Sequence, residues 1–454
     1  MKKIVVLSMV FILLASLFLA VSADEIPEKP TTPITIRVSV AQTGNGFEIL
    51  TKAAEDFNAS QSDYVVDLYY GGGYGDILIS LQTGTQADRP DIFHSSGNDT
   101  AAYINMEDKM YIPVNDFIQA EGYDDSNIVA NLRTNYQRNG EWQCWPLGNT
   151  NVGLYYNTGV LKQFGIDFKD LKSYQEILEA CKTLKEAGYE NFYYLRALTH
   201  IDWLNYALTA QGVQYYDNEN GRAGVPTKAL YDDGGECQEA TTAYFQFLRE
   251  VVDNYLYDPT VSANDARISF AKGELVFMDG YSSGAGSIIN LVAENDNLVE
   301  WNYGVSPVVE VDHTTKGQSP GGGALFIANT GDYWREQGAW EFMKYLMSDE
   351  VTSAYAMATG YTPITESGSK TPEYIEYSTN IFPDVVDIIE AQKNTEAGVA
   401  YAPIPFSAEA NNLYKEIAAQ ILEDPSYTAE QACADFAAGT NEVVELYRLT
   451  NGLD

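Results

Sequence analysis

The chain has 454 residues, of which 45% are hydrophobic and 13% aromatic, and it carries a formal net charge of −37. Since a single hydrophobic core stops growing at roughly 250 to 300 residues, this length predicts at least two lobes with separate cores. A negative charge of this size excludes nucleic acid and anionic membranes as favoured partners, because their phosphate groups would be repelled.

The first 23 residues have the pattern of a signal peptide. Lys2 and Lys3 precede the apolar stretch 4–20, and the small residues of "AVSA" follow it, so we expect cleavage after Ala23. No cysteine lies near this boundary, and a lipid anchor is therefore not expected. The proline-rich segment 24–33 is expected to be a flexible leader. No later run approaches about 20 apolar residues, so the mature chain is expected to be soluble.

Strand and helix patterns alternate from residue 34. Apolar residues alternate in "ITIRVSV" (34–40), which predicts a strand, and those of "GFEILTKAAEDFNAS" (46–60) recur at helical spacing. "YVVDLYY" (64–70) and "PDIFH" (90–94) are predicted to be the next strands. This β-α-β order is typical of a parallel sheet covered by helices.

The pattern restarts after a break near Gly148. "VGLYYN" (152–157) predicts a strand, and Ser173 with Glu176 forms a capping box before a helix that Gly188 should end. Later, "AYFQFLREVVDNY" is predicted to be helical, and "ELVFMDG" and "GGGALFIAN" are predicted strands. A second α/β lobe is therefore expected.

Motifs for catalysis and for metal binding are weak. The three histidines, His94, His200 and His313, lie far apart and have no metal-ligand spacing, so neither a metal nor a cofactor is expected. The glycine-rich stretches "GGGYGD" and "GAGS" do not continue into a phosphate-binding loop. Carboxylate pairs for glycoside hydrolysis arise by chance among 64 acidic residues, which leaves a carbohydrate-active enzyme open as an alternative.

The cysteines are too widely spaced for a zinc ribbon or a C-x-x-C redox motif; they are Cys144, Cys181, Cys237 and Cys433. One or two disulfides remain open for an exported chain. Cys181 lies on the apolar face of the predicted helix after Ser173, so we expect a buried thiol there.

Aromatic and amide side chains gather in turn-rich segments. Trp142 and Trp145 precede "PLGNTN", Trp203 lies in "HIDWLNY", and Tyr281 precedes "SSGAGS". Aromatic rings stack on the C–H faces of sugars, and amides, carboxylates and hydroxyls bind the sugar hydroxyls. This mixture predicts a neutral polyol ligand.

Several longer motifs occur in an order typical of one family. They are "WPLGNTNVGLYYNTGVLKQFGID", "SFAKGELVFMDGYSSGAGS", "NYGVSPV", "GGGALFIANTGDYWREQGAWEFMKYLMSDE" and "TGYTPIT". In this set the chain resembles extracellular solute-binding proteins of ABC importers, of the maltose-binding type (family 1 carbohydrate binders), and most of all their glycerol-3-phosphate-binding members. The resemblance covers nearly the whole mature chain.

The resemblance implies an α/β, two-lobed periplasmic-binding-protein fold of class II type, with a hinge and an interlobe cleft that closes on the ligand. The expected boundaries are 34–147 and 308–350 for lobe 1, and 151–305 and 355–454 for lobe 2. The chain would cross between the lobes near Gly148, near Pro307 and near Ser353. In the third crossing, Pro363 would stiffen the turn that presents Tyr361 to the cleft.

The same resemblance implies a ligand-binding site in the cleft. Its expected residues are Tyr74, Asp76, Asn149, Thr150, Trp203, Tyr281, Ser282, Ser283, Gly322, Gly323 and Tyr361. Trp203 would match one of two cleft tryptophans, and Thr199 or His200 stands where the other would lie. Glycerol-3-phosphate binders carry a basic residue in a late segment, whereas "EAGVAYAPIPFSAEANN" (396–412) has none. Phosphate would thus lack a charged partner, with Arg196 as the one candidate substitute.

We therefore expect a receptor without enzymatic activity that delivers a mono- or oligosaccharide to the transmembrane subunits of an ABC importer. It is expected to be a monomeric periplasmic protein without a lipid anchor. A glycerol-3-phosphate or glycerophosphodiester receptor is the alternative within the class, and a secreted carbohydrate-active enzyme is the less favoured alternative.

Overall fold

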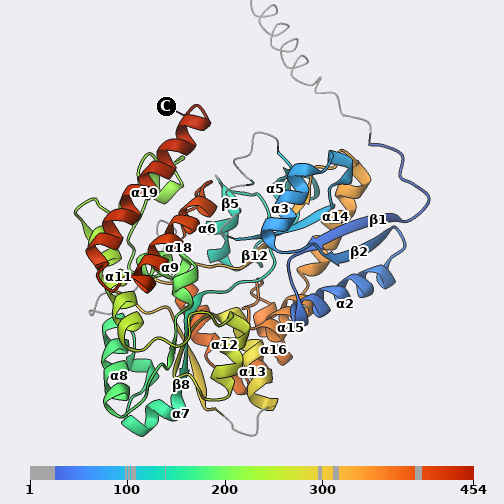
Figure 1. Cartoon of the computed structure of the whole chain (residues 1–454). Coiled ribbons are helices and arrows are strands. Elements are labelled where there is room, and N and C mark those ends of the chain that lie inside the picture. The colour runs from blue at the N-terminus through green and yellow to red at the C-terminus, as the bar shows by residue number, and fades with distance from the viewer. Residues whose placement is uncertain are drawn as a thin grey trace, which may run out of the picture.

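The structure, a computed structural model, describes residues 26–97, 100, 103, 109–138, 140–294, 299–309, 316–393 and 401–453. The predicted signal peptide, residues 1–23, and His313 lie outside the described residues. Within the described ranges, no helix is long and apolar enough to cross a bilayer. Two principal β-sheets, each with its own helices, lie side by side (Figure 1).

The first sheet confirms the predicted β-α-β beginning. Its strand order is β2 (Tyr64–Tyr70), β1 (Ile34–Val40), β3 (Ile92–Ser96), β12 (Gly323–Ala328) and β4 (Tyr111–Ile112), and β7 (Trp145–Pro146) also pairs with β12. β1 is parallel to both β2 and β3, whereas β12 returns antiparallel to β3. The accompanying helices are α2 (Gly44–Ser60), α3 (Tyr74–Thr83), α5 (Val114–Glu121), α14 (Tyr333–Leu346) and α15 (Asp349–Thr359).

The second sheet has the order β11 (Trp301–Val305), β8 (Val152–Asn157), β10 (Phe277–Tyr281) and β9 (Tyr193–Tyr194). Every residue of β8 is buried, because helices cover both faces of the sheet. The helices packed around this sheet or on one another are α7 (Thr158–Leu161), α8 (Tyr174–Glu186), α9 (Asp202–Ala210), α10 (Asp217–Gly221), α11 (Glu236–Asn254), α12 (Ala263–Ala271), α13 (Ala285–Glu294), α16 (Pro372–Asn380), α17 (Val385–Lys393), α18 (Ser407–Glu423) and α19 (Ala429–Thr450).

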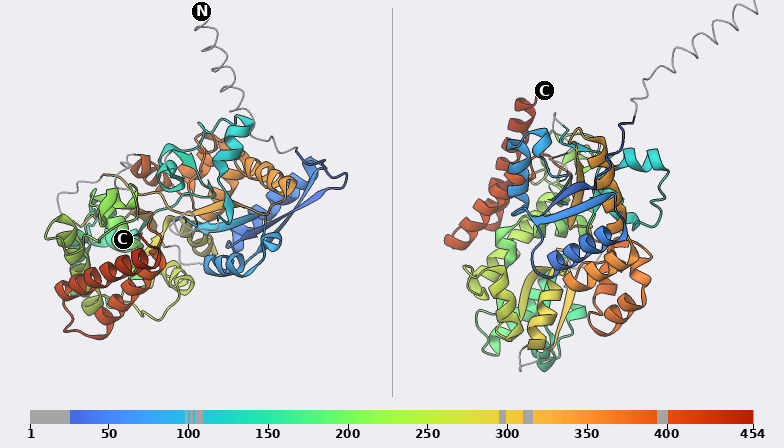
Figure 2. Two further views of the ribbon diagram at one scale, coloured as in Figure 1. Left: turned by 90° about the horizontal axis from the view of Figure 1, so that it is seen from above. Right: turned by 90° about the vertical axis from the view of Figure 1, so that its right-hand side faces the viewer.

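Short elements complete the described chain. They are α6 (Arg133–Tyr136), the ribbon of β5 (Gln137–Arg138) and β6 (Glu141–Trp142), and the 3₁₀ turns η1 (Gln86–Asp88), η2 (Ala130–Leu132), η3 (Lys162–Phe164), η4 (Phe168–Asp170), η5 (Arg196–Thr199), η6 (Ser282–Gly284) and η7 (Gly368–Lys370). Seen from above, the C-terminal helices, in red, lie far from the first strands, in blue (Figure 2). The end of the chain is therefore part of the second half of the molecule.

Each sheet carries its own apolar core. Trp142 and Trp145 are fully buried in the first core, where the ring of Trp145 lies 5.6 Å from the rings of Trp142 and Trp340. These two tryptophans therefore stabilise the fold and are not available to a ligand. The second core joins β8 and β10 to α8, α11, α18 and α19.

Local signals around α8 are as predicted. Ser173 accepts a hydrogen bond from Glu176 N, and Glu176 accepts one from Ser173 N at 2.9 Å, which completes the capping box. Cys181 on this helix is fully buried, as expected. All four cysteines are buried free thiols, so the disulfides left open by the sequence are absent among the described residues.

Part of the predicted leader contacts α14 and the turn before β2. Trp334 Nε1 donates a hydrogen bond to Pro27 O at 2.9 Å, and Lys29 Nζ lies 2.6 Å from a carboxylate oxygen of Asp63. Both contacts are exposed, and each contributes about 1 kcal/mol or less.

The segments that join the two sheets are hydrogen-bonded to one another. The chain passes from β7 to β8 through residues 147–151 and from β11 to β12 through residues 306–322. Thr150 exchanges backbone hydrogen bonds with Gly321, and Asn149 O accepts one from Thr362 N at 2.7 Å. These backbone pairs hold the segments together at one side of the cavity described below, which is called its floor.

Candidate ligand-binding site

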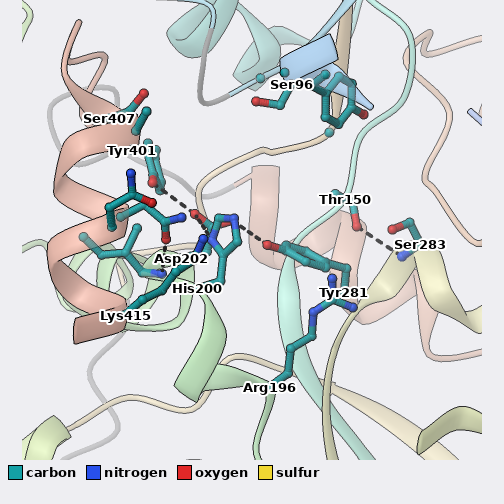
Figure 3. Close-up of a pocket in the computed structure, with 18 of the residues that line it drawn as sticks. Ser96, Thr150, Arg196, His200, Asp202, Tyr281, Ser283, Tyr401, Ser407 and Lys415 are labelled. Atoms are coloured by element: carbon teal, nitrogen blue, oxygen red, sulfur yellow. Dashed lines mark hydrogen bonds and ion pairs between the residues drawn. The ribbon is translucent and has the colours of Figure 1, made fainter. Parts of the chain in front are cut away.

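A cavity of about 580 Å³ lies where the connecting segments meet, between the two sheets (Figure 3). Its walls come from the N-terminus of α3, the end of β3, the first connecting segment, η5 with α9, the end of β10, and α18. The lining residues are Tyr74, Gly75, Ser96, Gly97, Thr150, Arg196, His200, Ile201, Asp202, Tyr281, Ser283, Gly322, Tyr361, Tyr401, Ser407, Ala408, Asn411, Asn412 and Lys415.

The floor of the cavity depends on a glycine at position 322. Gly322 has φ +116°, which disfavours other residues, and a Cβ there would lie 2.2 Å from Gly148 O. Gly322 O accepts a hydrogen bond from Gly97 N at 2.6 Å, which ties the connecting segment to the end of β3. Beside it, Thr150 Oγ1 lies 2.8 Å from Ser282 Oγ and accepts a hydrogen bond from Ser283 N.

Tyr361 borders the cavity because α15 ends abruptly. Gly360 closes that helix with φ +89°, and the Tyr361 ring then stacks on Tyr355 at 5.6 Å with an interplanar angle of 22°. The ring also lies against Gly148, where a Cβ would come within 2.8 Å of it. Burial raises the pKa of Tyr361, so its hydroxyl is a neutral group at physiological pH.

A buried carboxylate organises the opposite wall. Asp202, at the start of α9, accepts hydrogen bonds from the hydroxyls of Tyr281 at 2.5 Å and Tyr401 at 3.0 Å. His200 Nδ1 lies 3.3 Å from Asp202 Oδ1. Burial alone would raise the pKa of Asp202, but His200 and the two hydroxyls together hold it below its usual value. In the same way, although burial lowers the pKa of His200, the Asp202 charge raises it above its usual value.

Two cationic side chains also line the cavity. The Arg196 guanidinium lies 5.0 Å from the ring centroid of Tyr281 and 6.0 Å from that of Trp203, so it is held by cation–π contacts. Lys415 extends from α18 on the other side (Figure 3). Segment 396–412 itself contains no basic residue, but α18 continues past it and Lys415 lies one turn beyond Asn411 on the same helical face. The cavity therefore contains basic residues, although segment 396–412 has none.

The structure brings only part of the expected site into the cavity. Tyr74, Thr150, Tyr281, Ser283, Gly322 and Tyr361 line it, and Asp76, Asn149, Trp203, Ser282 and Gly323 do not. Asp76 is instead a helix cap: it is exposed and accepts a hydrogen bond from Gly73 N at 2.8 Å. Gly323 belongs to β12, where a Cβ would clash with His94.

The remaining three residues lie behind the cavity wall. Asn149 forms a reciprocal amide pair with buried Gln392, at 2.9 and 3.0 Å. Ser282 is fully buried, and its hydroxyl oxygen lies 2.8 Å from the hydroxyl oxygen of Thr150. Trp203 is 3% exposed, and its ring packs at 5.1 Å behind that of Tyr281, so Tyr281 is the aromatic face that borders the cavity on this side.

Several cavity residues were not expected from the sequence. They are Gly75, Ser96, Gly97, Ile201, Asp202, Tyr401, Ser407, Ala408, Asn411, Asn412 and Lys415. The sequence did contain one signal for three of them. Ser407, Asn411 and Lys415 recur every four residues, a spacing that predicts a polar stripe on one face of a helix. Over the residues that the structure describes, no group of three or more His, Cys, Asp or Glu side chains is placed to hold a metal ion.

The arrangement suits reversible binding of a small polar ligand. Tyrosine rings offer faces for stacking, and hydroxyls, amides and cationic groups point toward the cavity from both halves of the molecule.

Comparisons with known proteins identify relatives of this chain. A sn-glycerol-3-phosphate-binding periplasmic protein from Agrobacterium fabrum is 24% identical over 331 residues, which is 72% of this chain and 73% of the relative. The GacH receptor of Streptomyces glaucescens, solved without ligand and with acarbose, matches with a TM-score of 0.73 at 16% identity and covers 91% of this chain and 99% of its own.

The UgpB protein of Mycobacterium tuberculosis, solved in complex with glycerophosphocholine, matches with a TM-score of 0.70 at 17% identity, over 92% of this chain and 100% of its own. These solved structures confirm the expected two-lobed α/β fold of the periplasmic-binding-protein type. A model of the bacterial extracellular solute-binding protein family matches residues 52–382, which is more than half of the chain. The chain therefore belongs to the bacterial extracellular solute-binding protein family.

Proposed function

We propose that the chain is an extracytoplasmic receptor that binds a carbohydrate in this cavity and delivers it to an ABC importer. The observation that carries the proposal is the composition of the cavity wall, which combines the rings of Tyr74, Tyr281, Tyr361 and Tyr401 with hydroxyl and amide groups from both halves of the molecule. Stacking rings and neutral hydrogen-bonding groups are what a polyhydroxylated ligand requires. The GacH receptor, solved with acarbose, is consistent with this ligand class.

Delivery would depend on closure of the two halves about the connecting segments. Each half keeps its own core, and residues 147–151 form a short link between them. A ligand that contacts both walls would stabilise the closed arrangement, and the closed receptor would then dock on the transmembrane subunits. The receptor acts as a monomer and performs no chemistry on its ligand.

A thermal-shift screen tests this function, with maltose, maltotriose, ribitol, glycerol 3-phosphate and glycerophosphocholine as probes. A carbohydrate present at 100 times its dissociation constant adds about 2.7 kcal/mol to the free energy of unfolding. Small-angle scattering with the best probe should then show a smaller radius of gyration. Recovery of the probe unchanged after incubation checks that no reaction occurs. Absence of a shift with every carbohydrate would reject the proposal.

A second candidate ligand is a phosphate ester of a polyol, and a specific observation favours it. Arg196 and Lys415 both line the cavity, and the helices α3 and α18 begin at its wall with Tyr74 and Ser407. Cationic groups and the partial positive charge at helix N-termini both stabilise a phosphate. The glycerol-3-phosphate-binding relative supports the same class of ligand.

We also propose that the protein is periplasmic, with a signal peptide cleaved after Ala23 and no lipid anchor. The sequence pattern of residues 1–23 and the absence of a cysteine near the cleavage point support this. N-terminal sequencing and intact mass of the exported protein test it. A mature chain that still begins at Met1, or that carries an acyl group, would contradict it.

A further inference from the structure

The turn that brings charge to the cavity has little regular structure of its own. η5 spans Arg196–Thr199, and His200 and Asp202 follow directly. Its internal hydrogen bonds include a long one from Leu198 N to Leu195 O at 3.3 Å. A short 3₁₀ turn of this kind needs outside support to present side chains in a fixed direction.

That support comes from two core side chains that hold one residue of the turn. Ala197 N donates a hydrogen bond to Asp279 Oδ2 at 3.2 Å, and Ala197 O accepts one from the Tyr414 hydroxyl at 2.6 Å. Tyr193 donates to the other oxygen of Asp279 at 3.1 Å. Ala197 lies next to Arg196, so the direction of the Arg196 side chain depends on these two contacts.

A buried carboxylate at this position of β10 carries a desolvation penalty when it is ionised. Asp279 is buried, and burial raises its pKa to about 7 even though the hydrogen bonds from Ala197 and Tyr193 act to lower it. An apolar side chain or an amide would avoid the desolvation penalty of the charged form. Stability alone therefore does not account for an aspartate at this position.

We propose that Asp279 is a positioning residue, which fixes the turn carrying Arg196 and His200 from within the core and so sets the affinity of the cavity. The proposal deepens, and rests on, the binding function proposed above for the same cavity. Asp279 does not line the cavity, so it acts on a ligand indirectly, through its hydrogen bond to Ala197 and through its charge, which faces Arg196.

The ionisation of Asp279 provides a readout that a merely structural role would not give. A charged acceptor forms a hydrogen bond roughly twice as strong as a neutral one, so the Ala197 amide should be better protected above pH 7 than below it. The titratable and charged groups that face Asp279 are Tyr156 on β8, Tyr174 on α8, Tyr193 and Tyr194 on β9, Tyr244 on α11, Tyr414 on α18, and Arg196. Burial raises the pKa values of these tyrosines, so they stay neutral across this pH range.

Amide hydrogen exchange tests the proposal without any ligand. Exchange of the segment 195–201 is measured by mass spectrometry at pH 6 and pH 8 and corrected for intrinsic rates. Asp279→Ala should speed exchange of this segment roughly three- to tenfold, as expected for the loss of one hydrogen bond. Asp279→Asn keeps an acceptor oxygen and should restore protection at pH 6, while losing the extra protection of the native protein at pH 8.

Asp384→Asn is the matched control. Asp384 is also a buried carboxylate that accepts a backbone hydrogen bond, from Tyr303 N at 2.8 Å, and its pKa is also raised by burial. This variant should leave exchange of 195–201 unchanged. Native exchange in Asp279→Ala, or native pH dependence in Asp279→Asn, would overturn the proposal; if Asp279→Ala does not fold, Asp279→Asn decides.

Calorimetry with maltose and with glycerol 3-phosphate connects the turn to binding. Asp279→Ala should weaken binding of the better probe about tenfold, whereas Asp384→Asn should not. If Asp279→Ala binds the probe as tightly as the native protein does, the proposal that Asp279 sets the affinity of the cavity is overturned. If the native protein binds neither these probes nor any carbohydrate of the screen, the proposed function fails, and hydrogen exchange still decides the role of Asp279.

Discussion

The hydroxyl of Tyr281 donates a hydrogen bond to the buried carboxylate of Asp202 at 2.5 Å, and this contact joins the end of β10 to the start of α9. The Tyr281 ring lies between the cavity and Trp203. The aromatic wall is thus held at one end by a charged hydrogen bond and along its back by a second ring. Its orientation is fixed before a ligand binds, which lowers the entropy lost on binding.

Trp203 and Tyr281 should respond differently to substitution. Trp203→Ala removes a buried ring and should lower the free energy of unfolding by about 3 to 5 kcal/mol. It should weaken binding only indirectly, through movement of Tyr281 and Arg196, which contact the Trp203 ring. Tyr281→Phe keeps the ring but leaves Asp202 with one donor fewer, at a cost of about 1 to 3 kcal/mol. Urea denaturation and calorimetry with maltose measure both quantities. A Trp203→Ala protein of native stability that no longer binds would contradict the placement of Trp203 behind the wall.

Gly322→Ala should damage the floor of the cavity. The new Cβ would meet Gly148 O at 2.2 Å, in a backbone conformation that alanine disfavours, so the loss of stability should be about 1 to 3 kcal/mol or more. Gly75→Ala is the control, because it also borders the cavity and its Cβ would meet no atom within 4 Å. Thermal unfolding of the two variants checks this. Equal melting temperatures would show that the segment 321–323 relaxes freely.

Arg196→Gln and Lys415→Gln should separate the two candidate ligands. If the ligand is a phosphate ester, each change removes a charge-assisted hydrogen bond and should weaken binding of glycerol 3-phosphate by about 1.5 to 3 kcal/mol. Binding to the native protein should also weaken as salt rises, because added ions screen the attraction. For a neutral sugar, both variants should bind maltose within about threefold of the native affinity. Calorimetry at two ionic strengths measures these differences.

His200 should make stability depend on pH. Its pKa in the folded state is raised above the ordinary value of 6.5 by Asp202, so its contribution is fully present below pH 6.5 and is lost as pH rises through the raised pKa. Arg196 and Lys415 also face His200 and oppose its protonation. The difference in unfolding free energy between the native protein and His200→Gln should therefore shrink as pH increases. Denaturant titrations at half-unit pH steps follow this difference, and a constant difference from pH 6 to pH 9 would refute the coupling.

The sequence by itself determined the local elements and their order. Alternation in residues 34–40 and 64–70 and the capping box at Ser173 predicted elements that the structure contains, because each signal depends only on neighbours within a few residues. The order of motifs also identified the family. The resemblance to that family placed Thr150 and Tyr361 in the ligand site, and both line the cavity.

Only the tertiary structure decided which side chains face the cavity. Every residue of α9 is buried, so its sequence has no polar face from which to tell that Asp202 borders the cavity and Trp203 lies behind it. Asp202 and Tyr401 are hydrogen-bonded across 199 positions of the chain, and Lys415 reaches the same wall from α18. Such contacts depend on how helices pack against a sheet, and no periodicity within a single segment encodes them. Packing therefore decided which charged side chains line the cavity, whereas the fold that positions them could be predicted from the sequence.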